Sequence, residues 1–217
     1  MIQVNAERYS SVHLPSGYPV HDPKSDQILA AATEIFMEAG YAAAAMDTVA
    51  KRARVSKTTL YSRFPSKEQL FATCVSTLCD ALGARQLTGM FDDVTISTAL
   101  EILGDGLLAL IWSPPALRAQ QVVLGEAPRQ PDLARIFYDA GPARTMEMVT
   151  RFFEHAQAQG RLSVSDPGFA ARQFTAALLG HFDCELRFGL RTPPEQEERR
   201  QHVRAVVALF LTGAAAR

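Results

Sequence analysis

The sequence predicts an all-α fold of about nine helices. From Pro23 onward, apolar residues recur at helical spacings, and no segment alternates between apolar and polar residues as a half-buried strand does. Prolines and glycines divide this pattern into segments that each have the length of one helix. Hydrophobic residues make up 47% and charged residues 21% of the 217, which is a globular composition with enough chain to bury a core.

The N-terminal segment is predicted to form an arm followed by a first helix. Residues 1–22 contain proline, glycine and serine without helical periodicity, so we expect a flexible arm with few basic residues. Apolar residues at i, i+4, i+7 and i+8 then run from Ile28 to Phe36, and Gly40 ends this helix. These apolar positions share one face, which we expect to be buried.

Two short helices joined by a tight turn are predicted to follow. The first covers residues 47–53 and has its apolar residues on one side. After a short connection, Ser56 can cap a third helix over residues 57–64. Leu60 and Phe64 lie at i and i+4 in this helix and are expected to face the core. The pattern is therefore a helix, a turn and a short basic helix.

The rest of the chain is predicted to form longer helices. Residues 66–69 have the pattern of a capping box, and apolar residues repeat at helical spacing from Phe71 to Leu82. Further helices are expected near residues 95–111, 115–124, 142–159, 167–189 and 194–213, with a short extra turn near 131–139.

Composition and cysteine usage predict a cytoplasmic protein. No apolar run approaches the roughly 18 residues that span a bilayer, and the N-terminus lacks the order of a signal peptide. Cys74, Cys79 and Cys184 form neither a C-x-x-C pair nor a disulfide framework, which fits a reducing compartment. We expect Cys74 and Cys79 to be core residues, and we expect no structural zinc, no cofactor and no membrane partner.

Basic charge is concentrated in one short window, although the formal net charge of the chain is −1. Residues 51–67 contain six basic and no acidic residues, whereas residues 71–217 contain 14 basic and 16 acidic residues. Such a window can dock a polyanion. The alternative is a solvated basic face, and charge alone leaves both interpretations open.

The predicted third helix carries side chains that suit the major groove of DNA. Lys57 can reach a base edge or a phosphate, while Thr58 and Thr59 offer hydroxyl and methyl groups. Tyr61 can bond a phosphate, and no acid neutralises the first turn of the helix. Lys67, at the start of the next helix, offers a second position for phosphate.

The segment 55–71 closely resembles the end of the DNA-binding domain of tetracycline-repressor (TetR) family regulators; its sequence is VSKTTLYSRFPSKEQLF. Residues 39–41 and 46–50 resemble the first turn and second helix of that domain. The resemblance implies a homodimeric regulator, usually a repressor, that binds a palindromic operator in double-stranded DNA and is released by a small-molecule effector. We therefore expect a helix-turn-helix domain at 23–70 and an effector-binding and dimerisation domain at 71–217.

The resemblance and the side-chain chemistry together indicate which residues contact DNA. The expected contacts are Ser56, Lys57, Thr58, Thr59, Tyr61, Ser62, Arg63 and Lys67. Thr58 departs from the family pattern, because many members have glycine there, and this can change base preference. Ala44 and Ala45 stand where members carry a hydroxyl residue, which removes an expected cap and phosphate ligand. Arg63, where an aromatic residue or histidine is common, can replace part of that contact.

Residues 122–133 and 137–142 resemble the AefR-like C-terminal domain within this family. The last two predicted helices have strong apolar stripes, which suggest a symmetric four-helix interface between two chains; the alternative is intramolecular core. The resemblance favours the interface. Its expected residues are Phe174, Leu178, Phe182, Leu186, Val203, Val206, Val207 and Phe210.

A small hydrophobic or amphipathic effector is expected among the middle helices, coupled to the DNA-binding helices through the fourth helix. The expected lining residues are Trp112, Phe137, Met146, Phe152, Phe153 and His181. The alternative is plain core, which is the usual role of such residues at helical spacing. His181 and Cys184 share one face at i, i+3, but that face lacks a third metal ligand, so we predict no metal site.

Two other function classes compete with DNA binding. An enzyme is not predicted, because the sequence has no G-x-S-x-G, P-loop, G-x-G-x-x-G or H-E-x-x-H motif. A helical interaction module would instead use the basic helix against protein. Salt dependence separates the two, since DNA affinity falls steeply as salt rises.

Overall fold

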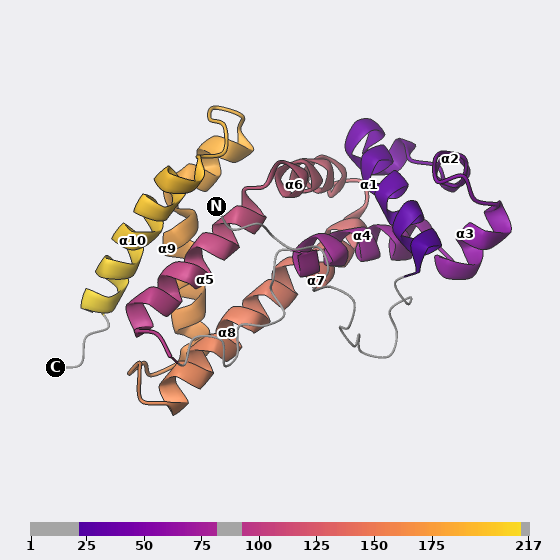
Figure 1. The fold of residues 1–217 in the computed structure, drawn as a ribbon. Helices are drawn as coiled ribbons and strands as arrows, with labels where there is room; N and C mark the ends of the chain where they lie inside the picture. The colour runs from indigo at the N-terminus through magenta and orange to yellow at the C-terminus, as the bar shows by residue number, and fades with distance from the viewer. Residues whose placement is uncertain (1–21, 82–92, 214–217) are drawn as a thin grey trace.

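The computed structural model describes residues 22–81 and 93–213, and these ranges hold ten α-helices and no strand (Figure 1). The helices are α1 (Pro23–Ala43), α2 (Met46–Arg52), α3 (Lys57–Arg63), α4 (Lys67–Ala81), α5 (Ile96–Ile111), α6 (Pro114–Glu126), α7 (Pro131–Ala140), α8 (Pro142–Ala158), α9 (Pro167–Arg187) and α10 (Gln196–Gly213). The predicted all-α fold is confirmed. Residues 1–21 of the expected arm, and Leu82, lie outside the described residues.

The segment expected to be a short extra turn is a full helix, α7, of 10 residues. Pro131 opens it, where a missing N–H costs nothing, and Gly141 separates it from α8. Leu133 and Ala140 are buried. A short helix of this kind is stable because one face packs against the rest of the molecule.

Side-chain caps determine where α1 and α3 begin. Asp22, which the sequence assigned to the arm, caps α1: its Oδ1 accepts from the N–H of Lys24 at 2.8 Å and of Ser25 at 3.0 Å. Ser56 caps α3, because its Oγ accepts from the N–H of Thr59 at 3.0 Å, as the sequence predicted. The start of α3 is thereby fixed relative to the turn that precedes it.

Buried apolar side chains form two separate clusters, which we call the first core and the second core. The first joins α1–α4 to the end of α6 and to α7, through Val123, Leu133 and Ala140. The second joins α5, α8, α9 and α10 to the start of α6. In Figure 1, α1–α3 lie at one end of the molecule, α9 and α10 at the other, and α6 and α7 between them. Because α6 contacts α1 and α7 contacts α4, the connection between the two ends uses more than the predicted fourth helix.

Most residues predicted for a dimer interface are core residues of a single chain. Five of them are at most 3% exposed, namely Phe174, Leu178, Leu186, Val203 and Val207. The other three are half-buried and pack against the same cluster, namely Phe182, Val206 and Phe210. The assignment of the five buried side chains to an interface is wrong, because a side chain covered by its own chain has no surface left for a partner.

α10 packs closely against α5 beside Gly104. A Cβ atom on this residue would lie 2.8 Å from Val203 Cγ1 and 3.1 Å from Leu178 Cδ2. The adjacent Asp105 accepts a hydrogen bond from Arg199 Nε at 2.6 Å. These contacts fix which face of α10 is buried and leave the opposite face exposed.

Candidate nucleic-acid interface

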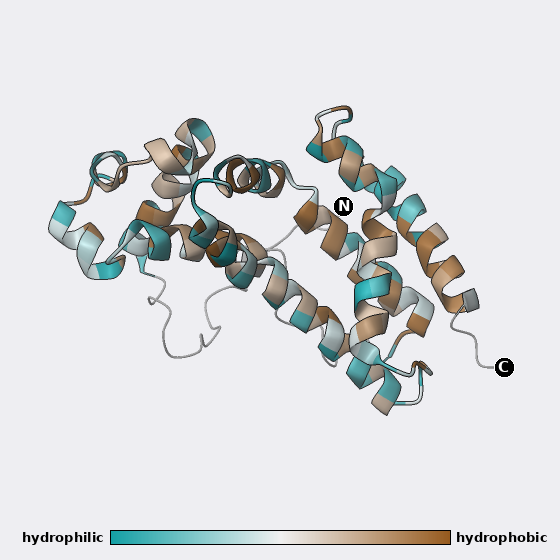
Figure 2. Cartoon of the chain, turned by 180° about the vertical axis from the view of Figure 1, so that it is seen from behind, coloured by the Kyte–Doolittle hydropathy of each residue, from teal (hydrophilic) through white to brown (hydrophobic). Residues whose placement is uncertain are grey.

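α3 is held by its inner face, which leaves a polar outer face at the end of the molecule. Leu60 and Phe64 are 0% exposed. Thr58, Tyr61 and Ser62 are exposed, and α3 is mainly teal and pale in Figure 2, as expected for a hydrophilic helix. A rigid helix that exposes hydroxyl groups has the shape and chemistry to enter a major groove.

Lys57 already has a partner, which the sequence did not indicate. Its Nζ lies 2.5 Å from Oδ2 of Asp47, in the first turn of α2. The two side chains are 64% and 51% exposed, so water competes with the pair. An exposed ion pair contributes only about 0–1 kcal/mol, and a phosphate or a base edge can therefore replace the carboxylate.

The hydroxyl groups of three other predicted contacts are engaged within α3. The Oγ of Ser56 and the Oγ1 of Thr59 are 2.8 Å apart, and the Oγ of Ser62 donates to the carbonyl of Thr59 at 3.0 Å. Ser56 and Thr59 thus support the helix start, and Thr59 is only partly exposed. Thr58 and Tyr61 are the predicted contacts with the most freely presented hydroxyl groups.

Lys67 holds α1 onto α4. Its Nζ donates to the carbonyls of Tyr41 at 2.7 Å, Ala42 at 3.3 Å and Ala44 at 3.0 Å, and it lies 4.3 Å from the centre of the Tyr41 ring. Burial lowers the pKa of this ammonium group. All three N–H donors are used inside the protein, so Lys67 is a structural residue here and not the free phosphate ligand that the sequence suggested.

Arg63 is likewise engaged. Its Nη2 lies 3.1 Å from Oδ2 of Asp22, the residue that caps α1. The N–H of Ser25, followed by that of Lys24 and the Arg63 guanidinium, holds the pKa of Asp22 below its ordinary value. The side chain of Arg63 thereby joins the end of α3 to the start of α1. It does not substitute for a phosphate ligand at α2, which begins at Met46 and whose N-cap residue, Ala45, makes no side-chain hydrogen bond.

The basic window therefore contains fewer free cations than its charge suggests. Arg52 is also paired, with its Nη1 at 2.7 Å from Oε2 of Glu38. Among the described residues, only Lys51 and Arg54 of the six basic residues show no side-chain hydrogen bond or ion pair. The sequence did not single out these two, because the partners of the other four, which are acidic side chains or backbone carbonyls, lie outside the window.

The residues predicted to line an effector pocket do not form one site. Trp112, Phe152 and Phe153 are at most 4% exposed in the second core, whereas Phe137 packs against the first core. Met146 lines an open groove on α7 and α8, and the side chain of His181 is 84% exposed beside Glu185. The prediction that His181 lines a pocket is wrong, because it is a surface residue. The aromatic residues fill the two cores, which is the alternative that the sequence left open.

The second core contains an aromatic cluster around Trp112. The ring of Trp112 lies 5.7 Å from that of Phe182 and 6.0 Å from that of His202, whose Nε2 donates to the Leu178 carbonyl at 2.8 Å. That carbonyl precedes a break in α9 at Gly180, where φ is 48°. The buried atoms Trp112 Nε1, Gln120 Oε1 and Asp183 Oδ1 have no hydrogen-bond partner within the described residues.

Metal-binding clusters and membrane-spanning helices are both absent from the part of the chain that the structure describes. In residues 22–81 and 93–213, no group of three or more His, Cys, Asp or Glu side chains is placed to hold a metal ion. Over the same ranges, no single helix is long and apolar enough to cross a membrane, although α5 and α6 pass that test as a pair bent by 56°.

Two family matches cover most of the chain. Residues 28–74 match the bacterial regulatory proteins of the tetR family, and residues 98–213 match the AefR-like transcriptional repressor C-terminal domain. The chain belongs to the TetR family of transcriptional regulators. The first match contains α2, α3 and the turn between them, which is the helix-turn-helix that the sequence predicted.

Similar proteins agree with this family membership. A TetR-family regulator from Mesorhizobium loti MAFF303099 has 27% identity and a TM-score of 0.76, with 88% of this chain and 96% of that chain covered. The flavonoid-responsive regulator FrrA has 33% identity and a TM-score of 0.69 over the same shares. The transcriptional activator FasR of Mycolicibacterium smegmatis is 45% identical over 67 residues, which are 30% of this chain and 31% of FasR. The chain thus matches less than a third of the length of FasR.

Proposed function

We propose that this TetR-family regulator binds a palindromic DNA operator as a homodimer, with α3 in the major groove, and that a small molecule releases it. The observation that carries the proposal is the outer face of α3, where Thr58 and Tyr61 are exposed on a helix anchored by buried Leu60 and Phe64. Lys57 completes this face once DNA replaces its exposed Asp47 partner. The proposed contacts are base edges for Lys57 and Thr58 and a phosphate for Tyr61.

Lys57→Ala and Tyr61→Phe are each expected to weaken operator binding by about 1–3 kcal/mol without changing the fold. Both side chains are exposed, so their removal takes away DNA contacts and little internal packing. Fluorescence anisotropy with a DNA fragment found by genomic footprinting measures the affinity, and circular dichroism measures helix content.

Arg151→Ala is a matched control for Lys57→Ala. Arg151, on α8, is also 64% exposed and paired with an acid, Glu147. Its loss is expected to leave operator affinity unchanged. Wild-type affinity in both Lys57→Ala and Tyr61→Phe would contradict the assignment of α3.

We propose that the dimer forms through the exposed faces of α9 and α10. Opposite the buried stripes, these helices carry small or apolar exposed residues, which allow two pairs of helices to approach closely. The proposed contact face comprises Ala176, Ala177, Gly180, Cys184, Ala205, Ala208 and Leu209. Light scattering on the whole chain tests the dimer.

We propose that the effector is a planar aromatic compound with hydroxyl groups and that it binds near Trp112. A buried polar atom without a partner is costly, and the N–H of Trp112 would pair with a hydroxyl group of such a ligand. FrrA, 33% identical, is described as flavonoid-responsive. A flavonoid added to the operator complex is expected to release the DNA. Unchanged binding at saturating flavonoid would contradict this ligand class.

The direction of regulation is proposed to be repression, because the matched C-terminal domain is described as that of a repressor and covers residues 98–213. Activation is the second candidate, since FasR is described as an activator. Transcription in vitro from a promoter that contains the operator distinguishes them: added protein lowers the transcript if it is a repressor and raises it if it is an activator.

A further inference from the structure

Arg54 adopts a backbone conformation that side-chain-bearing residues rarely adopt. Its φ is 52°, and it is the only non-glycine residue with positive φ among the described residues. Left-handed backbone costs a residue with a Cβ more than it costs glycine. Such strain tends to be kept where the side chain has a function.

The position of Arg54 is close to the proposed DNA contacts. It lies in the turn between α2 and α3, and two residues separate at most about 7 Å along an extended chain, so its Cα is near that of Ser56, the cap of α3. A major groove is about 12 Å wide, so phosphates flank any helix that lies in it. The long side chain of Arg54 can span the distance from the start of α3 to such a phosphate.

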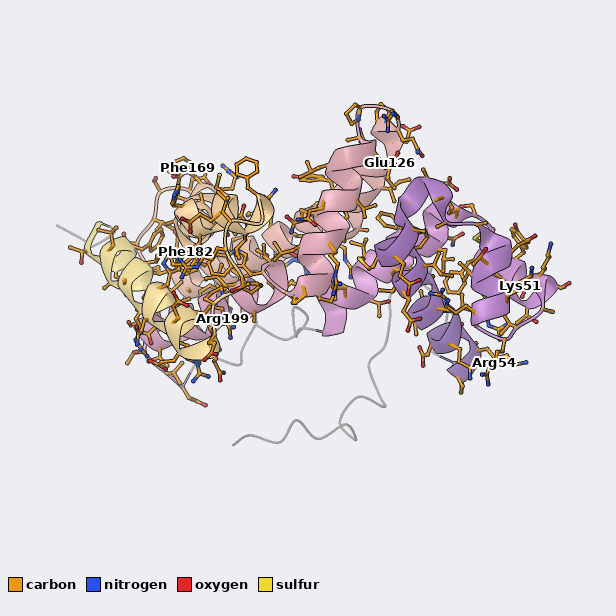
Figure 3. All side chains as sticks on the ribbon, turned by 90° about the horizontal axis from the view of Figure 1, so that it is seen from above. Lys51, Arg54, Glu126, Phe169, Phe182 and Arg199 are labelled. Carbon is orange, nitrogen blue, oxygen red and sulfur yellow. The ribbon has the colours of Figure 1, made fainter. Side chains whose placement is uncertain are left out.

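Lys51 is the other unengaged cation of the basic window. It is exposed in the last turn of α2, and Figure 3 labels it and Arg54 at the same end of the molecule. Neighbouring basic residues are held by Asp47, Glu38 and Asp22. The two free side chains thus add positive charge to this end without an internal partner.

We propose that Arg54 and Lys51 bind backbone phosphates beside the groove that α3 enters, and that they fix the orientation of α3 without reading base sequence. This inference rests on the proposed DNA binding through α3. Guanidinium and ammonium groups are the usual phosphate ligands, and such contacts are independent of sequence. A phosphate contact would therefore explain why arginine stands at a position where glycine would relieve the backbone strain.

The test compares Arg54→Gly and Lys51→Ala with wild type on a labelled DNA duplex of random sequence, by anisotropy at several KCl concentrations. Removal of one phosphate-binding side chain is expected to reduce the slope of log affinity against log salt by about 0.9, which weakens binding about eightfold at ~0.1 M salt. Arg54→Gly is expected at the same time to raise the melting temperature by about 2–8 °C, because the strain of the left-handed backbone is relieved.

Arg135→Ala, which removes a side chain that is 83% exposed on α7, is the charge-matched control and is expected to keep the wild-type slope. If wild type shows no salt-dependent DNA binding, the proposed function and this inference both fail. If wild type binds and Lys57→Ala weakens binding, but Arg54→Gly and Lys51→Ala keep the wild-type slope, this inference alone fails. A lower melting temperature for Arg54→Gly would make Arg54 a structural residue and would also overturn it.

Discussion

Phe174→Ala is expected to lower the free energy of unfolding by about 3–5 kcal/mol, because it leaves a cavity in the second core. Phe174 is 0% exposed, and its ring lies 5.8 Å from that of Phe153 and 5.3 Å from that of Phe210. The substitution therefore removes ring contacts to α8 and α10 together. Urea denaturation followed by circular dichroism, at one fixed protein concentration, measures the change.

Phe169→Ala is the matched control, because it is the same substitution in the same helix. Phe169 is 54% exposed at the start of α9, where Figure 3 labels it. Its loss is expected to change the free energy of unfolding by no more than about 0.5 kcal/mol. Equal destabilisation in the two variants would contradict the burial of Phe174 within its own chain.

These two phenylalanines illustrate what periodicity can and cannot predict. The spacing from Phe174 to Leu186 correctly indicated one apolar stripe on a long helix. It did not indicate whether that stripe packs against the same chain or a second one, because both environments are apolar and dry. In the fold, α5 and α8 cover the stripe, so it packs against its own chain. Apart from Leu209, the residues proposed for contact with a partner are small, and small residues give a weak hydropathy signal.

The DNA-binding end was predicted more completely, because its structure depends on local sequence. The Ser56 cap, the buried Leu60 and the turn between two short helices all follow from neighbours within a few positions. The partners of the basic residues were missed, because they are distant in sequence: Arg63 contacts Asp22, and Lys67 contacts the end of α1. A count of charges in a window cannot include partners that the fold supplies from outside it.

Leu209→Asp is expected to convert the proposed dimer to monomers and thereby to weaken operator binding. Leu209 is 75% exposed on the outer face of α10 and belongs to no buried cluster, so the chain can fold with an acid there. In the interface, an unpaired carboxylate loses its hydration, which makes the free energy of dimerisation less favourable by about 2–5 kcal/mol. The dimer is then roughly 30- to 4,000-fold weaker. Light scattering measures the mass, and anisotropy measures operator binding by the same sample.

Leu124→Asp is the control for a new exposed acid, since Leu124 on α6 is 59% exposed and lies outside α9 and α10. It is expected to keep both the dimer and operator affinity. A Leu209→Asp chain that keeps the dimeric mass would place the interface elsewhere. A monomer that still binds the operator as tightly as wild type would separate dimerisation from DNA recognition, because a palindromic site is bound tightly only when two α3 helices occupy its half-sites together.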